Sequence, residues 1–182
     1  MKKHPGFFLY ALAALIALLP GCVLDAAERV SLRSGWEWTR SISDADSWAP
    51  VPDSMLSTLD QLPGNEIGIF WMRQKFSVPE SLSKEALSVY LGRITMADRV
   101  WLNGVYIGGE GSMESDTLSE WNRVRLYRLP GNALSSGENT LLVQIRGDHE
   151  AALVSSPFIG LAQDAAQAAF AEKFWNSLIN IL

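Results

Sequence analysis

Apolar and polar residues alternate with a period of two between residues 87 and 107, which is typical of strands with one buried face. The first run covers 87–91, and a second run covers 100–102. Asn103-Gly104 separates the second run from a third one at 105–107. Both residues of a two-residue hairpin turn need positive φ, so Asn-Gly predicts a tight turn here. We therefore expect an antiparallel meander of three strands at the centre of the fold.

The same alternation recurs along the rest of the chain. Between residues 67 and 78, Phe70, Met72 and Phe76 share one face of a predicted strand. Pro157 indicates an edge position for the last strand, because proline lacks the N–H that a central strand donates. Loop residues fill 41–64, with Trp48 expected to plug the core. Further strands are predicted at 30–32, 36–38, 122–129, 140–146 and 152–159.

About eight short strands with no helical period between them favour an all-β protein. We expect an antiparallel β-sandwich of the jelly-roll kind. The period changes after Gln163, where Phe170, Phe174, Leu178 and Ile181 fall on one stripe of a C-terminal amphipathic helix. Three arrangements stay open: the stripe packs on the sandwich, it lies on a membrane or a protein partner, or the chain enters a transmembrane segment there.

The N-terminal segment has the order of a secretory signal, since Lys2 and Lys3 precede an apolar run at 7–19. The following Leu-Pro-Gly-Cys resembles a bacterial lipobox, which makes Cys22 the predicted lipidation site. A signal cleaved without lipidation and an uncleaved anchor are the alternatives. We expect a membrane-anchored protein outside the cytoplasm, in the periplasm or on the outer membrane. The predicted organisation is a signal peptide with lipobox at 1–22, a linker and first strand at 23–35, the sandwich at 36–161 and the helix at 162–182.

Composition narrows the classes of partner. A formal net charge of −5 leaves no basic surface for nucleic acid. The single cysteine excludes an intramolecular disulfide. Seven of the 182 residues are tryptophan, a residue that either stacks on sugars or fills the core of a sandwich.

Catalytic groups are sparse. His149 is the one histidine beyond the signal segment, and no G-x-S-x-G motif accompanies it, so a hydrolytic triad is not expected. One histidine and one cysteine also exclude a zinc site. We expect no cofactor. A structural calcium ion is the open alternative to a solvated acidic loop, with two sets of carboxylates as its ligands: Glu110, Glu114, Asp116 and Glu120, or Asp148 and Glu150.

Three blocks of sequence together resemble the sugar-binding domain of family 2 glycoside hydrolases. FWMRQKFSVP at 70–79 resembles its W-Y-R-R-x-F-x-V-P strand, and DRVWLNGVYIG at 98–108 resembles its A-x-V-W-L-N-G-x-x-V-G hairpin. LPGNALSSGENTLLV at 129–143 resembles its closing segment. WNRVRLYRLP at 121–130 is closer to the jelly-roll domain of sialate O-acetylesterases and of bacterial extracytoplasmic sensor proteins. Over 36–160 the resemblance implies a galactose-binding-domain-like β-sandwich.

The resemblance also bears on function. In these families the catalytic groups belong to other domains, which implies that this chain is non-catalytic. Asn103 occupies the W-x-N-G corner, whose asparagine approaches the sugar in the galactosidase branch. Sugar recognition needs an exposed aromatic ring beside amide and guanidinium donors. The predicted ligand-binding residues are Trp101, Asn103, Trp121, Asn122 and Arg125.

A purely structural role for these residues is the alternative. The tryptophans would pack in the core, Arg73 and Arg125 would pair with carboxylates inside the sandwich, and Asn103 would serve only its turn. We expect a non-catalytic binding or sensing module for carbohydrate or another small polar ligand. The alternatives are an accessory domain of a glycoside hydrolase or esterase, and a truncated sensor domain of a membrane signalling protein. A protein partner could also bind the C-terminal helix.

Overall fold

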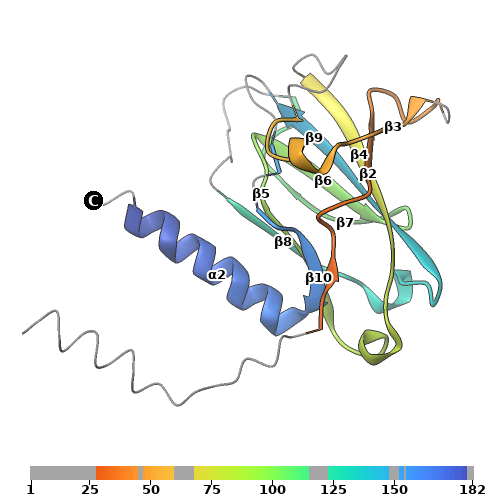
Figure 1. The fold of residues 1–182 in the computed structure, drawn as a ribbon, viewed down its shortest axis with the longest axis vertical. Coiled ribbons are helices and arrows are strands. Elements are labelled where there is room, and N and C mark those ends of the chain that lie inside the picture. The colour runs from red at the N-terminus through yellow and green to blue at the C-terminus, as the bar shows by residue number, and fades with distance from the viewer. Residues whose placement is uncertain are drawn as a thin grey trace, which may run out of the picture.

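The computed structural model describes residues 28–44, 47–59, 68–114, 123–147, 152–153 and 155–179. In this part of the chain ten strands form two antiparallel sheets, followed by one α-helix (Figure 1). The four-stranded sheet has the order β1 (Val30–Ser31), β10 (Phe158–Leu161), β5 (Leu87–Arg93), β8 (Val124–Arg128). The six-stranded sheet has the order β3 (Ala49–Pro50), β2 (Trp36–Thr39), β4 (Gly68–Ser77), β9 (Glu138–Gly147), β6 (Ala97–Leu102), β7 (Val105–Glu110). The helix is α2 (Ala162–Ile179), and single 3-10 turns are η2 (Asp53–Met55), η4 (Glu80–Leu82) and η5 (Gly131–Ala133).

Both sheets contribute to one hydrophobic core. Phe70 and Met72 of β4 and Val143 of β9 lie in the same cluster as Val89 and Leu91 of β5, and all five side chains are buried. The alternation along β4 therefore has the predicted meaning, with one face inside and the other outside. The expectation of a mostly β protein with two antiparallel layers is confirmed.

The predicted hairpin between residues 102 and 105 is confirmed. Asn103 has φ of 49° and Gly104 has φ of 82°, the left-handed conformation that this turn requires. The turn joins β6 to β7, which pair in antiparallel register. The hairpin therefore forms one end of the six-stranded sheet.

The predicted three-stranded meander is wrong, because β5 and β6 belong to different sheets. The chain changes layer in the bend between them, where Met96 has φ of 59°. The partner of β6 on its other side is β9, from much later in the sequence. Moreover, β5 is buried on both faces, since α2 covers the side that Ser88 and Tyr90 occupy. Ser88 and Tyr90 are therefore buried, although their alternation with the leucine and valine residues of β5 predicted that they would face solvent.

The last strand also differs from its prediction. β10 begins only at Phe158, and it lies between β1 and β5 rather than at an edge. Pro157 immediately precedes the strand, so its missing N–H removes no ladder bond. Its carbonyl oxygen accepts a hydrogen bond from the Leu32 N–H at 3.0 Å.

Small residues dock α2 on the four-stranded sheet. Ala165 and Ala169 are buried against Tyr90, Val124 and Phe158. Alanine lets the helix approach closely, and the larger side chains of the sheet fill the interface. Figure 1 shows α2 along the outer side of this sheet, beside β8 and β10.

The aromatic stripe of α2 points away from the sheet, so of the three arrangements left open by the sequence, packing of the stripe on the sandwich is not the one found. Phe170 is 71% exposed, Phe174 is 53% exposed and Leu178 is 39% exposed. Ile181, the fourth member of the predicted stripe, lies outside the described residues. None of the helices in the described ranges is both long and apolar enough to cross a membrane.

A partly buried carboxylate fixes the middle of α2. Glu172 accepts hydrogen bonds from the Tyr90 hydroxyl, from Arg93 Nε at 3.1 Å and from Ser155 Oγ at 2.7 Å. Burial of the phenol, followed by its hydrogen bond to Glu172, raises the pKa of Tyr90 to about 12. The neutral phenol is therefore favoured more in the folded chain than in the unfolded chain, where its pKa is about 10.

This pKa shift predicts a loss of stability at alkaline pH. A group whose folded pKa is raised contributes stability that is complete below about pH 10 and is lost as the pH rises through about 12. We expect the free energy of unfolding to fall more between pH 9 and pH 11.5 in the wild type than in Tyr90→Phe. Denaturant unfolding of both proteins at the two pH values measures this, and equal losses would refute the role of the phenol.

Candidate functional site

An aromatic cluster lies on the outer face of the six-stranded sheet. It consists of Trp71 of β4, Trp101 of β6 and Tyr106 of β7. The ring centroids of Trp71 and Trp101 are 5.4 Å apart, and those of Trp101 and Tyr106 are 5.6 Å apart. Both tryptophans are partly exposed, and Tyr106 is 54% exposed. The rings therefore form a surface outside the core.

The position of β9 brings the two tryptophans together. Leu142 of β9 is paired with both Arg73 and Trp101, one on each side. Two residues further along β9, Gln144 is paired with Trp71 of β4 on one side and with Arg99 of β6 on the other. The two tryptophans therefore lie on the strands that flank β9, offset by two residues, and their large rings on the outer face span the width of that one strand. Trp71 and Trp101 thus meet over β9 although they are distant in sequence.

A pocket of about 610 Å³ opens beside these rings, and we call it the tryptophan pocket. Trp101 and Tyr106 give it an aromatic wall, and Gln144 and Glu114 bring polar groups to it. In the part of the chain that the structure describes, neither the Gln144 amide nor the Glu114 carboxylate has a hydrogen-bond partner. Both groups are therefore available to a ligand. The full lining is Arg99, Trp101, Tyr106, Ser112, Met113, Glu114 and Gln144.

Arg99 fixes the wall of the tryptophan pocket. Its guanidinium donates to the carbonyl oxygens of Asp98 at 2.6 Å, Glu110 at 3.3 Å and Gly111 at 3.1 Å. These bonds hold the end of β7 and the start of the following loop against β6. No carboxylate among the described residues forms an ion pair with Arg99, so its positive charge remains at the pocket.

The aromatic surface continues toward the other side of the sheet. Arg73 of β4 forms an ion pair with Glu37 of β2, with Nε 2.7 Å from the carboxylate. The guanidinium carbon of Arg73 also lies 4.1 Å from the centroid of the Trp48 ring. The prediction of Trp48 as a core plug is therefore wrong, because this ring packs on a partly exposed cation instead.

Asn103 is engaged within the fold rather than turned toward a ligand. Its Nδ2 donates to the carbonyl oxygen of Ala133 at 2.8 Å and to Oδ1 of Asn139 at 2.8 Å. Its Oδ1 accepts a hydrogen bond from the Thr140 N–H at 2.8 Å. The Asn103 side chain therefore ties the β6–β7 hairpin to the start of β9. This is a structural role, which the sequence offered as the alternative to ligand binding.

Arg125 is wrongly predicted as a ligand-binding residue, because it lies entirely in the interior. Its Nε donates to Oδ1 of Asp98 at 2.6 Å, and both side chains are 0% exposed. The hydroxyl of Tyr127 donates to the other oxygen of Asp98 at 2.5 Å. Burial, and after it the charge of Asp98, raise the pKa of Tyr127, so this hydroxyl stays a donor. The interior ion pair that the sequence offered as an alternative is the arrangement found.

Several predicted residues lie outside the described residues, and their assignments stay predictions. Among the residues that are described, no group of three or more His, Cys, Asp or Glu could hold a metal ion. Glu110, one of the proposed calcium ligands, forms an ion pair with Arg123 at 2.5 Å. The residues that were assigned a role from the sequence and lie outside the described part of the chain are Cys22, Asp116, Glu120, Trp121, Asn122, Asp148, His149 and Glu150.

Seven residues of the tryptophan pocket and its aromatic cluster were not in the predicted ligand-binding set: Trp71, Arg99, Tyr106, Ser112, Met113, Glu114 and Gln144. The strand alternation does place Trp71 and Gln144 on outward faces. What the sequence lacks is the order of the strands, without which these positions cannot be assigned to one patch.

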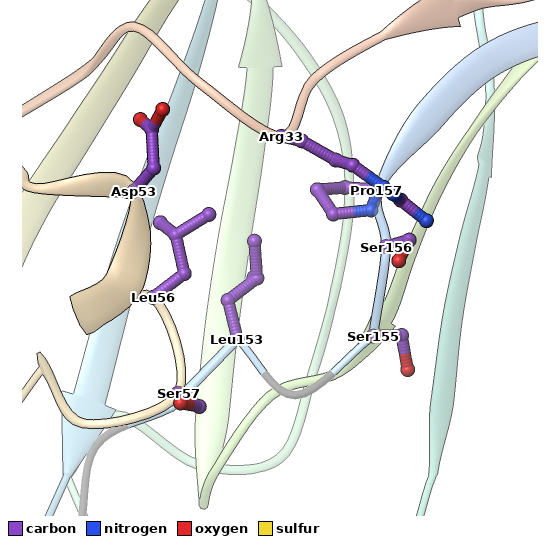
Figure 2. Close-up of a pocket in the computed structure, with 8 residues that line it drawn as sticks. All are labelled: Arg33, Asp53, Leu56, Ser57, Leu153, Ser155, Ser156 and Pro157. Atoms are coloured by element: carbon purple, nitrogen blue, oxygen red, sulfur yellow. The ribbon is translucent and has the colours of Figure 1, made fainter.

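A second, more polar pocket of about 370 Å³ lies near β1 and η2 (Figure 2). Figure 2 shows the Arg33 side chain extending toward Pro157 and away from Asp53. No aromatic ring lines this pocket, so it offers no surface on which a sugar ring could stack. Its lining is Arg33, Asp53, Leu56, Ser57, Leu153, Ser155, Ser156 and Pro157.

Solved structures share this fold. A beta-glucuronidase from glycoside hydrolase family 2 is 15% identical, with a TM-score of 0.56 over 75% of this chain and 18% of its own. The beta-glucuronidase of Bacteroides uniformis is 12% identical, with a TM-score of 0.52 over 72% of this chain and 17% of its own. The putative beta-galactosidase of Bacteroides fragilis is 12% identical, with a TM-score of 0.53 over 72% of this chain and 23% of its own.

This chain therefore spans about a fifth of the length of the hydrolases that it matches. At these identities the likeness establishes the fold: the chain has the fold of one part of family 2 glycoside hydrolases, as its sequence motifs suggested. No protein-family model matches the chain, and no curated protein matches its sequence.

Proposed function

We propose that this chain is a carbohydrate-binding module and that the tryptophan pocket is its binding face. The observation that carries this proposal is the partly exposed cluster of Trp71, Trp101 and Tyr106 beside the Gln144 amide, which has no hydrogen-bond partner among the described residues. The apolar face of a sugar ring can stack on such rings, while its hydroxyls bond to amide and carboxylate groups. The proteins that share the fold are named as glucuronidases and galactosidases, which supports a sugar as the ligand.

The shape of this face favours a chain of sugars over a single one. The aromatic and guanidinium groups extend from Tyr106 on β7 through Trp101 and Trp71 to Arg73 and Trp48 beside β2. Five strands lie along this line, in the order β7, β6, β9, β4, β2. With neighbouring strands about 4.8 Å apart, the line is about 19 Å long. A single pyranose ring would cover only a part of it.

Binding without hydrolysis fits the groups on this face. A glycosidase needs two carboxyl groups placed on either side of the scissile bond. Glu114 is the one carboxylate among the described residues that line the tryptophan pocket. The proposed module is therefore non-catalytic, and we place it outside the cytoplasm, tethered to a membrane through Cys22.

An accessory role in a larger hydrolase is the second candidate. It is favoured by the fold, which matches only about a fifth of the length of complete glycoside hydrolases. In that case the same face would deliver a polysaccharide to a catalytic domain elsewhere. Glycan binding by the tryptophan pocket is common to both candidates.

A screen of glycans of graded length tests the proposal. We expect affinity to rise from monosaccharides to tetrasaccharides as more of the aromatic line is covered, and tryptophan fluorescence of the full chain measures it. Gln144→Ala should weaken binding by roughly threefold to tenfold, the equivalent of one hydrogen bond. Thr140→Ala, at an outward position of the same strand but outside the pocket, is the matched control. Absence of binding to every glycan in the screen would contradict the proposal.

A further inference from the structure

The solvent side of α2 carries almost no charge, and four large apolar side chains lie on it between the middle of the helix and its C-terminal end. They are Phe170, Phe174, Trp175 and Leu178, and we call these four residues the α2 ridge. The ring centroids of Phe170 and Phe174 are 6.5 Å apart, and those of Phe174 and Trp175 are 5.9 Å apart. Lys173 is the one charged residue among the exposed positions of the described helix, which are Gln163, Ala166, Gln167, Phe170, Ala171, Lys173, Phe174, Trp175, Ser177 and Leu178.

The size and chemistry of the α2 ridge favour a lipid surface over a protein. The helix has 18 residues, so it is about 27 Å long and about 10 Å wide and presents about 270 Å². A stable protein interface buries about 800 Å² on each partner. A helix that lies in the plane of a bilayer buries one face of Trp, Phe and Leu side chains at the boundary of the headgroups, and Lys173 can extend its ammonium group to the headgroups.

The start of the described chain, which follows the predicted membrane tether in sequence, lies close to this helix. The guanidinium carbon of Arg29 lies 4.3 Å from the centroid of the Phe158 ring. Phe158 in turn packs with Ala165 and Ala169 in the cluster beneath α2. Cys22 precedes Arg29 by seven residues. An extended chain spans about 3.5 Å per residue, so seven residues reach at most about 25 Å from the Arg29 backbone.

We propose that α2 lies on the membrane surface with the α2 ridge at the boundary between headgroups and acyl chains. A bilayer that holds the lipid on Cys22, or the apolar run at 7–19, is within reach of the helix, and the tether raises its effective concentration there. α2 covers the four-stranded sheet, whereas the tryptophan pocket lies on the outer face of the six-stranded sheet. This arrangement presents the glycan-binding face to the side away from the membrane.

Site-directed spin labelling of the full chain tests this inference, which rests on the proposed tether. In a Cys22→Ser background, which lacks any other cysteine, Phe174→Cys places a label on the α2 ridge. Val105→Cys is the matched control, because Val105 is 47% exposed on the six-stranded sheet, whereas Phe174 is 53% exposed on α2, which covers the four-stranded sheet. Both proteins are reconstituted with phosphatidylcholine vesicles through the apolar run at 7–19. Accessibility of the label to oxygen and to a water-soluble nickel chelate is then measured.

We expect the label at position 174 to lose accessibility to the nickel chelate and gain accessibility to oxygen when vesicles are present, while the label at 105 changes little. Equal accessibility of both labels in vesicles would overturn the inference. Spin–spin broadening at position 174 without vesicles would mean that the labels of two chains lie close together. It would overturn the inference, because the α2 ridge would then bind a second copy of the chain. Failure of the chain to associate with vesicles would also overturn it. Glycan binding in solution involves no membrane, so its outcome is independent of these results.

Discussion

Arg125→Met is expected to lower the free energy of unfolding by about 3–5 kcal/mol, because it leaves a buried carboxylate without its cation. Arg125 and Asp98 are both 0% exposed and are joined at 2.6 Å. In the variant, the Tyr127 hydroxyl would be the remaining side chain among the described residues that donates a hydrogen bond to Asp98. A single neutral donor does not compensate for the desolvation of a carboxylate. Denaturant unfolding of the wild type and the variant measures the difference.

Two comparisons make this result specific. Arg73→Met removes an ion pair to Glu37 from the outer face, where the side chains are 28% and 37% exposed. We expect that variant to cost less than about 1 kcal/mol, since surface pairs are screened by water. The double variant Asp98→Leu with Arg125→Met removes both charges and should recover much of the loss. If Arg125→Met is no more destabilising than Arg73→Met, the interior ion pair is not as described.

This ion pair shows how far the pattern of the sequence reaches. Within β6, Asp98 alternates with Arg99 in the same way that Val100 alternates with Trp101, so its inward position follows from the period of two. An inward carboxylate requires a buried partner. The sequence offered Arg125 both as that partner and as a ligand-binding residue, and only the burial of its side chain decides between the two.

Local features were predicted well, because they depend on neighbouring residues. The Asn103-Gly104 turn and the two faces of β4 follow from backbone conformation and strand geometry alone. The sheet to which β5 belongs depends on contacts with β8 and β10, which are distant in sequence. Nothing in the alternation of 87–107 encodes that choice, and the meander was therefore predicted wrongly.

Only the part of the candidate site that lies in a local motif could be identified from the sequence, because the rest depends on the order of the strands. The motif singled out Trp101, and its position on an outer face makes it available to a ligand. Its neighbours Trp71 and Gln144 could not be joined to it, because β9 inserts between β4 and β6 only in the folded chain. The sequence left the orientation of α2 open, because it did not show that small residues, Ala165 and Ala169, make the contact in place of the aromatic stripe.

Trp101→Ala is expected to weaken glycan binding by about tenfold or more, the effect of removing a central aromatic contact from a binding surface. Trp101 is the ring that contacts both Trp71 and Tyr106, so its loss divides the aromatic line in the middle. The side chain lies on the outer face and is partly exposed, so the core should remain intact. An unchanged far-ultraviolet circular dichroism spectrum would confirm that the variant is folded.

Arg33→Ala is the matched control for this variant. It alters the polar pocket between β1 and η2. No aromatic ring lines this pocket, and it shares no lining residue with the tryptophan pocket. The decisive measurement is calorimetric titration of wild type, Trp101→Ala and Arg33→Ala with the longest glycan that the screen identifies. Wild-type affinity in Arg33→Ala together with weakened binding in Trp101→Ala is the expected result. Unchanged binding in Trp101→Ala, or weakened binding only in Arg33→Ala, would contradict the assignment of the glycan-binding face.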